Sequence, residues 1–263
     1  MDKIISFLFK NSVPGKTKFY QLIRSTGLKN TVTFRCKHDF KLSLSPFNYV
    51  DRIIMKEGFY ENEVFEAIVD RINTEKEVFW DIGANMGIHS LGIKWLMPSV
   101  EVYAFEPAPE MLQIIMKNEK LNKIKLNKVS SPLSDANQLL KLHLMSGNPG
   151  MNTIVPWKEA TYSDSILTST VTGDKLVNSR SLRQPTVIKI DTEGSEYNIL
   201  KGCHNILSDP ALHTVIFEGD NEALDDNENA VVNLLRRHNF TMSKLNRQEA
   251  AADHQLSNFI GIR

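Results

Sequence analysis

The hydrophobic positions of this chain follow two alternating periods, which predict strands and helices in turn. From Val78 onward, short apolar runs are separated by stretches with helical spacing, a pattern typical of βαβ units and a parallel sheet. The spacing predicts strands at 77–82, 100–106, 124–130, 186–191 and 213–218, with a closing strand at 258–262. Helices are predicted near 87–97, 109–121, 195–207 and 228–238. The last two strands are expected to form an antiparallel edge.

The N-terminal part follows different patterns. Alternating apolar residues between Thr31 and Leu44, broken at 37–39, predict a β-hairpin, and apolar residues at helical spacing from Glu61 to Ile72 predict a helix that packs on the sheet. Residues 1–10 are too short for a membrane span or a signal segment and suggest a docking helix. We therefore expect an N-terminal extension at 1–60 and one α/β domain at 61–263.

Residues 147–183 interrupt the alternation of strands and helices. They are rich in Gly, Ser, Thr and Asn, with Pro149 and Pro156, and read as a long loop insertion that has room for one extra strand. Such insertions are often lids or binding loops. Four of its residues would suit a sugar or polyketide acceptor, although a plain surface loop is an equal alternative: Met151, Asn152, Thr153 and Trp157.

Composition narrows the class of protein. The 263 residues are 41% hydrophobic and 24% charged, as in an ordinary globular protein. Lys plus Arg equals Asp plus Glu at 31 each, so no overall positive field favours nucleic acid. Residues 1–60 are basic, which allows a weak peripheral contact with an anionic surface, or only a solvated face. Cys36 and Cys203 have no metal-like spacing and suggest a reducing, cytoplasmic location.

The sequence VFWDIGANMG at Val78–Gly87 is typical of a nucleotide-binding loop between a strand and a helix. Gly83 allows a sharp turn, Gly87 allows close approach of a ligand, and the helix start offers free N–H groups. Asn85 replaces the second glycine of the dinucleotide fingerprint, and Asp81 would repel a pyrophosphate. A carboxylate there suits the sulfonium and amino groups of S-adenosylmethionine instead.

Glu106 ends the next apolar strand, nineteen residues after Gly87. An acid at this place binds ribose hydroxyls in folds of this kind. Strand, loop, helix and spaced acid together favour a cofactor site over a simple tight turn.

Acidic residues also follow the later strands. Asp191 closes the strand TVIKID, Glu218 closes HTVIFE, and Glu193 and Glu196 follow Asp191. Methyl transfer to a hydroxyl needs a base or a metal to remove or weaken its proton. We assign Asp191, Glu218 and Glu193 as candidate catalytic groups and leave open whether Asp191 and Glu218 instead hold Mg²⁺. Glu196 is equally consistent with a helix N-terminus, and Lys189 more often pairs with a carboxylate than acts in catalysis.

Five segments resemble the FkbM-type methyltransferase family, in order: DIGANMG, AFEPAPEM, SPLSD, IKIDTEGSEYNILKG and IFEGD. They span roughly residues 78–220, and Glu57–Glu61 and NFIGI also fit the family pattern. Pro132 departs from the alanine common in the third segment. The resemblance implies a class I, Rossmann-like fold: a mostly parallel, twisted seven-stranded sheet with an antiparallel C-terminal edge strand, preceded here by the hairpin and helix extension. It implies an S-adenosylmethionine site at Asp81, Gly83, Asn85, Gly87 and Glu106, with Ser134 and Asp135 near the adenine. To that site we add Ala84, His89, Pro107 and Asp191.

These observations favour an S-adenosylmethionine-dependent methyltransferase that O-methylates a carbohydrate, glycolipid or secondary metabolite. One alternative is a scaffold that kept the fold without the chemistry. A nicotinamide-dependent oxidoreductase is disfavoured by Asn85 and Asp81. A nucleic-acid methyltransferase should show a basic groove or an N/D-P-P-Y/F motif, and neither occurs.

Overall fold

The computed structural model describes residues 31–74, 76–145, 149–157, 160–246 and 256–263. The helix expected at residues 1–10 therefore lies outside the described residues. Within them, no helix is both long and apolar enough to cross a membrane.

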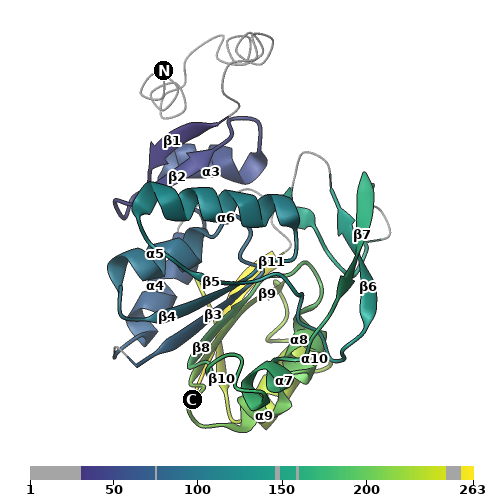
Figure 1. The fold of residues 1–263 in the computed structure, drawn as a ribbon. Coiled ribbons are helices and arrows are strands. Elements are labelled where there is room, and N and C mark those ends of the chain that lie inside the picture. Colours follow the sequence, from purple (N-terminus) through teal and green to yellow (C-terminus); the bar gives the residue numbers. More distant parts are fainter. Residues whose placement is uncertain (1–30, 75, 146–148, 158–159, 247–255) are drawn as a thin grey trace.

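A seven-stranded sheet forms the centre of the molecule (Figure 1). Its strand order is β10-β11-β9-β8-β3-β4-β5, and the five strands from β9 to β5 are parallel. Strand β11 is antiparallel to both β9 and β10, so the predicted antiparallel edge is confirmed. The strands are β3 (Val78–Ile82), β4 (Glu101–Phe105), β5 (Asn127–Val129), β8 (Val187–Ile190), β9 (Thr214–Asp220), β10 (Thr241–Lys244) and β11 (Leu256–Ile262).

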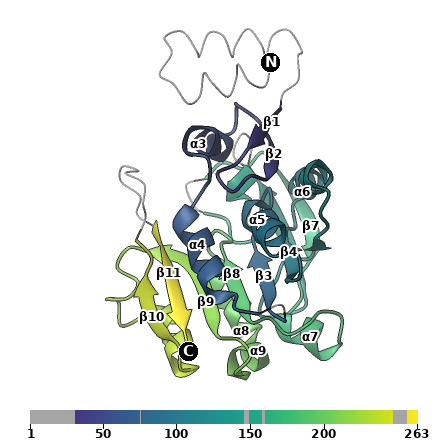
Figure 2. The same ribbon diagram turned by 90° about the vertical axis from the view of Figure 1, so that its left-hand side faces the viewer.

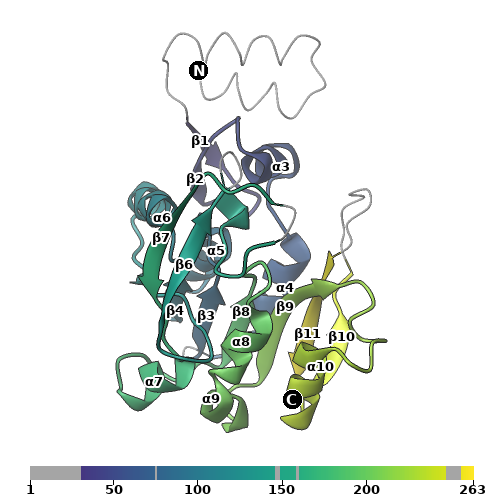
Figure 3. The same cartoon turned by 90° about the vertical axis from the view of Figure 1, so that its right-hand side faces the viewer.

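Helices cover both faces of this sheet because successive strand residues point to opposite sides. Phe79 packs with one face, under α4 (Asn62–Arg71), α5 (Ile88–Leu96) and α6 (Pro109–Asn122), which are in front in Figure 2. Trp80 packs with the other face, under α8 (Glu196–Lys201), α9 (His204–Ser208) and α10 (Ala230–Arg237), in front in Figure 3. Both side chains are fully buried, so the predicted α/β fold is confirmed.

The helix predicted at 195–207 is two short helices, α8 and α9, with a break at residues 202–203. A Cβ atom added to Gly202 would lie 2.1 Å from the carbonyl oxygen of Ser134. The chain from Ser134 thus passes directly against this point, and glycine permits the close approach.

The insertion at 147–183 holds more structure than a loop with one extra strand. It contains a 3₁₀ turn η1 (Pro149–Met151), strand β7 (Asp164–Ser169) and helix α7 (Gly173–Asn178). Strand β7 pairs antiparallel with the preceding β6 (Leu139–Leu144), which the sequence reading did not predict. This hairpin stands beside the carboxyl ends of the sheet strands (Figures 1 and 3).

The predicted N-terminal hairpin is present as β1 (Val32–Arg35) and β2 (Lys41–Leu44) and is followed by α3 (Tyr49–Glu57), which was not predicted. Apolar residues of the hairpin, such as Phe40 and Leu42, belong to the same core as Phe79 on the sheet. Asn118 and Asn122 of α6 bond to the backbone of β2. The division of the chain at residue 60 stays a prediction.

Candidate functional site

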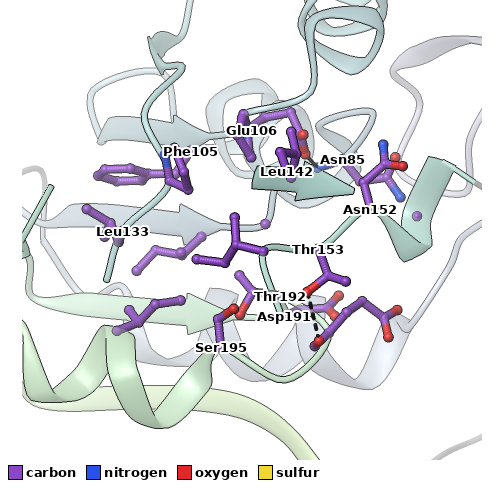
Figure 4. Close-up of a pocket in the computed structure, with 18 residues that line it drawn as sticks. Asn85, Phe105, Glu106, Leu133, Leu142, Asn152, Thr153, Asp191, Thr192 and Ser195 are labelled. Atoms are coloured by element: carbon purple, nitrogen blue, oxygen red, sulfur yellow. Dashed lines mark hydrogen bonds between the residues drawn. The ribbon is translucent and has the colours of Figure 1, made fainter. Parts of the chain in front are cut away.

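One cavity lies at the carboxyl ends of β3, β4 and β8, where ligands bind in open α/β sheets (Figure 4). The empty space in it is about 640 Å³ when the open mouth is included. Polar residues from three strand ends face it together with an apolar wall. The wall consists of Ile82, Phe105, Pro107, Pro132, Leu133, Leu142, Ile154 and Ile199.

The turn after β3 brings the backbone close to the neighbouring strand. Gly83 has φ +81°, and a Cβ atom there would lie 1.7 Å from the carbonyl oxygen of Asp191. The N–H groups of Gly83 and Ala84 donate to the carbonyl of Phe105. Gly87, also left-handed at φ +82°, ends the turn and caps α5. The loop predicted from the glycine spacing is therefore present, and only glycine fits at position 83.

Glu106 is a carboxylate of the cavity whose two oxygens are both fixed by backbone N–H groups. It is buried, and its two oxygens accept the N–H groups of Asn85 and Ala108, each at 2.8 Å. Burial raises its pKa to about 7 despite these bonds. Each carboxylate oxygen retains capacity for another donor, so Glu106 can bind a diol beside the apolar wall.

Asp81 does not line the cavity. It is fully buried, and its Oδ2 accepts the N–H of Ser90 at 3.1 Å and the hydroxyl of Ser90 at 2.6 Å. Its Oδ1 lies 3.6 Å from Nζ of Lys189. Asp81 thus ties the start of α5 to strand β8, and a direct cofactor contact stays a prediction.

Lys189 links three parts of the site. Its buried ammonium lies 3.1 Å from Oδ2 of Asp191 and 3.4 Å from the carbonyl oxygen of Gly83. Burial alone would lower the pKa of Lys189, but Asp191 and Asp81 outweigh burial and raise it. The pairing expected for this lysine is confirmed, and it orients Asp191, which lines the cavity.

Two further carboxylates gather near Asp191. Burial, then repulsion by Asp191, raises the pKa of Glu193 to about 7 and that of Glu218 to about 9. Glu193 lines the cavity and Glu218 does not. Glu196, the first residue of α8, instead accepts the N–H groups of Thr192 and Gly194 and the Thr192 hydroxyl, so it holds the turn that precedes this helix.

The metal site considered for Asp191 and Glu218 is not supported. Within the described ranges, no three His, Cys, Asp or Glu side chains are grouped so that they could hold a metal ion. Lys189 occupies one side of Asp191 and supplies a positive charge there.

The insertion closes one side of the cavity. The hydroxyl of Thr153 and the indole N–H of Trp157 both donate to the carbonyl oxygen of Glu193, each at 3.1 Å. Glu193 has φ +58°, and these two bonds hold its turn. Asn152 and Thr153 line the cavity, as the acceptor-site reading expected, whereas Trp157 and Met151 are not among the lining residues (Figure 4).

Five other predicted cofactor residues are not among those that line the cavity: Ala84, Gly87, His89, Ser134 and Asp135. His89 packs against Phe59 and Phe65, and burial lowers its pKa to about 4. Ser134 is buried, and Asp135 pairs with Lys201 at 2.9 Å. Their cofactor roles stay predictions.

The sequence reading missed several wall residues, including Leu142 and Ile154. The alternation of leucines in β6 was the available signal for Leu142, because it predicts a strand with one apolar face.

Comparisons with known proteins agree with this geometry. A family model described as the methyltransferase FkbM domain matches residues 81–242. The hexuronic acid methyltransferase AglP of Haloferax volcanii is 27% identical, with 60% of this chain and 62% of that protein covered. The methyltransferase sdnD of Sordaria araneosa is 26% identical, with 46% and 58% covered. The chain thus spans less than two thirds of these relatives. A solved S-adenosylmethionine-dependent methyltransferase of Agrobacterium tumefaciens shares the fold, with 10% identity, a TM-score of 0.50, and 89% of this chain and 70% of that chain covered.

Proposed function

This chain belongs to the FkbM methyltransferase family and has the class I methyltransferase fold, and we propose that it methylates a hydroxyl group of a carbohydrate, glycolipid or secondary metabolite with S-adenosylmethionine. The observation that carries the proposal is buried Glu106, oriented by two backbone N–H groups beside an apolar wall.

The residues of the cavity fit an adenosine moiety. A nucleoside needs apolar surfaces around its base and an acceptor for its ribose hydroxyls, and Phe105, Leu133 and Glu106 offer these on one wall. Gly83 leaves room at the turn that a Cβ atom would fill. When bound, S-adenosylmethionine would supply an electrophilic methyl group attached to a positively charged sulfur.

Two carboxylates at the end of β8 support transfer to a hydroxyl. Glu193 lines the cavity, and its pKa near 7 suits a general base at neutral pH. Asp191 is oriented by Lys189 and would position the acceptor or share its proton. Glu218, with a pKa of about 9, would stay protonated at neutral pH and act as a hydrogen-bond donor. A carbohydrate acceptor is favoured by the likeness to a hexuronic acid methyltransferase.

The cofactor assignment is tested by calorimetric titration with S-adenosylmethionine and S-adenosylhomocysteine, with NAD as the control ligand. Selective binding of the two sulfur compounds is expected. Glu106→Gln should weaken it by about 1.5–3 kcal/mol, the size of a hydrogen bond to a charged group. Glu228→Gln, an exposed change of the same chemistry, is the matched control. Equal affinity of both variants would refute the role of Glu106.

The chemical step is tested with the variants Asp191→Asn and Glu193→Gln, by transfer of a labelled methyl group to extracted glycans and lipids. Turnover should fall at least about 100-fold, the scale of a lost acid–base group, while the affinity for S-adenosylhomocysteine is kept. Full turnover in both variants would remove these carboxylates from the mechanism.

A further inference from the structure

A second, smaller cavity adjoins the outer side of the nucleotide-binding loop. Its volume is about 320 Å³ with its open part, and it shares Asn85 and Gly150 with the cofactor cavity. Helix α3 forms one side of it through Val50 and Asp51, and α6 forms another through Met111 and Ile114. Helix α3 precedes the region that the family model matches, so this wall is a contribution of the N-terminal part of the chain.

Asp51 is the one acidic residue among the described residues of this wall, and a hydrogen bond is found at only one of its two carboxylate oxygens. The side chain is buried at 4% exposure, and its Oδ2 accepts the N–H of Ser45 at 2.5 Å. Its Oδ1 has no hydrogen-bond partner among the described residues. Burial raises the pKa of Asp51 to about 6. The bond to the N–H of Ser45 needs only one carboxylate oxygen, so it does not explain why a second, unpaired oxygen is buried here.

A third cavity extends this site toward the β6–β7 hairpin. It measures about 970 Å³ with its open part, shares Asn48 with the second cavity, and shares Asn152 with the cofactor cavity. Asn85 and Asn152 both lie at the right-hand end of the cofactor cavity in Figure 4. Asn48 stands at the start of α3, but its side chain makes no cap hydrogen bond. The three cavities therefore adjoin one another around these amides.

The charges on these walls have one sign. The third cavity adds Glu110 and Asp164 to Asp51, and the cofactor cavity adds Glu106, Asp191 and Glu193. No Lys or Arg is among the described residues that line any of the three. Lys189, behind Asp191, is already paired with Asp81 and Asp191. A carboxylate of a ligand would therefore meet acids and no lysine or arginine among these lining residues, which is unfavourable, whereas hydroxyl groups can donate to these acids and bond to the amides.

We propose that the third cavity binds an uncharged, hydroxyl-rich part of the methyl acceptor, that one of its hydroxyls enters the narrow second cavity, and that Oδ1 of Asp51 accepts a hydrogen bond from this hydroxyl. This assignment rests on the proposed methyltransferase function. It predicts a neutral sugar rather than a uronic acid at this place, in contrast to what the name of the AglP relative indicates for that protein.

The test uses methyl β-D-glucopyranoside and methyl β-D-glucuronide, two probes that differ by a hydroxymethyl group against a carboxylate. Their dissociation constants are measured by saturation-transfer NMR at pH 8 on the full chain saturated with S-adenosylhomocysteine. The glucoside should bind at least about tenfold more tightly than the glucuronide, the ratio expected from one lost and one repelled polar contact.

Asp51→Asn keeps the bond to Ser45 through its amide oxygen and removes the charge. It should weaken glucoside binding about tenfold, the difference between a charged and a neutral hydrogen bond, and leave S-adenosylhomocysteine binding unchanged. Asn48→Ala, at a half-buried site without a cap bond, is the second variant and should also weaken the glucoside. Asp225→Asn, at an exposed site, is the matched control and should change neither affinity.

Each other outcome overturns the proposal in a recognisable way. Undetectable glucoside binding, or equal binding of both probes, rejects the neutral-sugar site. If Asp51→Asn instead weakens S-adenosylhomocysteine, the carboxylate serves the amino group of the cofactor. Unchanged glucoside binding in both variants rejects a sugar contact of Asp51 and leaves its bond to Ser45 as its only role. Failure of the unaltered protein to bind S-adenosylhomocysteine would reject the proposed function itself, whatever the sugar measurements show.

Discussion

Replacing Lys189 with methionine tests how strongly its ion pairs join the nucleotide-binding loop to strand β8. The lysine side chain is 5% exposed, and its partners Asp81 and Asp191 are 0% and 28% exposed. Methionine has a similar length but no charge, so two neighbouring carboxylates would remain without their cation. Removal of one partner from a buried pair typically costs about 3–5 kcal/mol. For a chain of this size, that corresponds to a fall of about 6–20 °C in Tm.

The sign of the pH effect sets the conditions of the measurement. Asp191 and Asp81 raise the folded-state pKa of Lys189 against the opposing effect of burial. Its contribution to stability is therefore complete below the unfolded value of about 10.4 and is lost only as the pH rises through the folded value. Urea unfolding at pH 7, followed by tryptophan fluorescence, thus reports the full contribution.

A double-mutant cycle separates the ion pair from packing. Lys189→Met, Asp81→Asn and the double variant are compared, and the double variant should be more stable than Lys189→Met alone because no unpaired carboxylate remains at Asp81. Lys201→Met, at an exposed lysine paired with Asp135, is the control and should leave Tm unchanged. A loss below about 1 kcal/mol for Lys189→Met, the size of an exposed pair, would refute the reasoning.

Three further predictions concern the loop, the buried acids and the insertion. Gly83→Ala should lower Tm and weaken cofactor binding, since its Cβ would lie 1.7 Å from the carbonyl oxygen of Asp191; normal calorimetric affinity would contradict this. The pKa of Glu218 is raised to about 9, so stability should fall as the pH rises from about 4, the unfolded value, to 9. Urea unfolding should show a flatter pH profile for Glu218→Gln, and an identical profile would count against the burial of that charge. Trp157→Phe removes the bond to the carbonyl of Glu193 and should speed hydrogen exchange in that turn; unaltered exchange would show that Thr153 alone holds it.

The sheet was readable in the sequence because each strand is a local, buried apolar run. Phe79 and Trp80 face opposite cores, as period-two geometry requires, and β4 follows β3 after one helical crossover. The glycine at 83 and the acid at 106 were also readable, because the turn and the strand end are set by residues close in sequence. The β6–β7 hairpin was not predicted. Its two strands are largely exposed and lie among polar residues, so the alternation of apolar and polar positions that indicates a strand is weak there.

The roles of the individual acids were decided only in three dimensions. The sequence by itself determined the fold class, the loop and the strand-end positions of Asp81 and Asp191, because local patterns encode strands and turns. Glu218, predicted to close its strand, lies within β9, which continues to Asp220 because β11 pairs with it there. The tertiary structure turned Asp81 toward Ser90 and Lys189 and away from the cavity, and it brought Asp51 beside the loop. Such contacts join residues far apart in the chain, and burial and neighbouring charge set their pKa values. A local sequence pattern contains neither the burial of a carboxylate nor the charges around it, so only the folded chain shows the chemistry of each carboxylate.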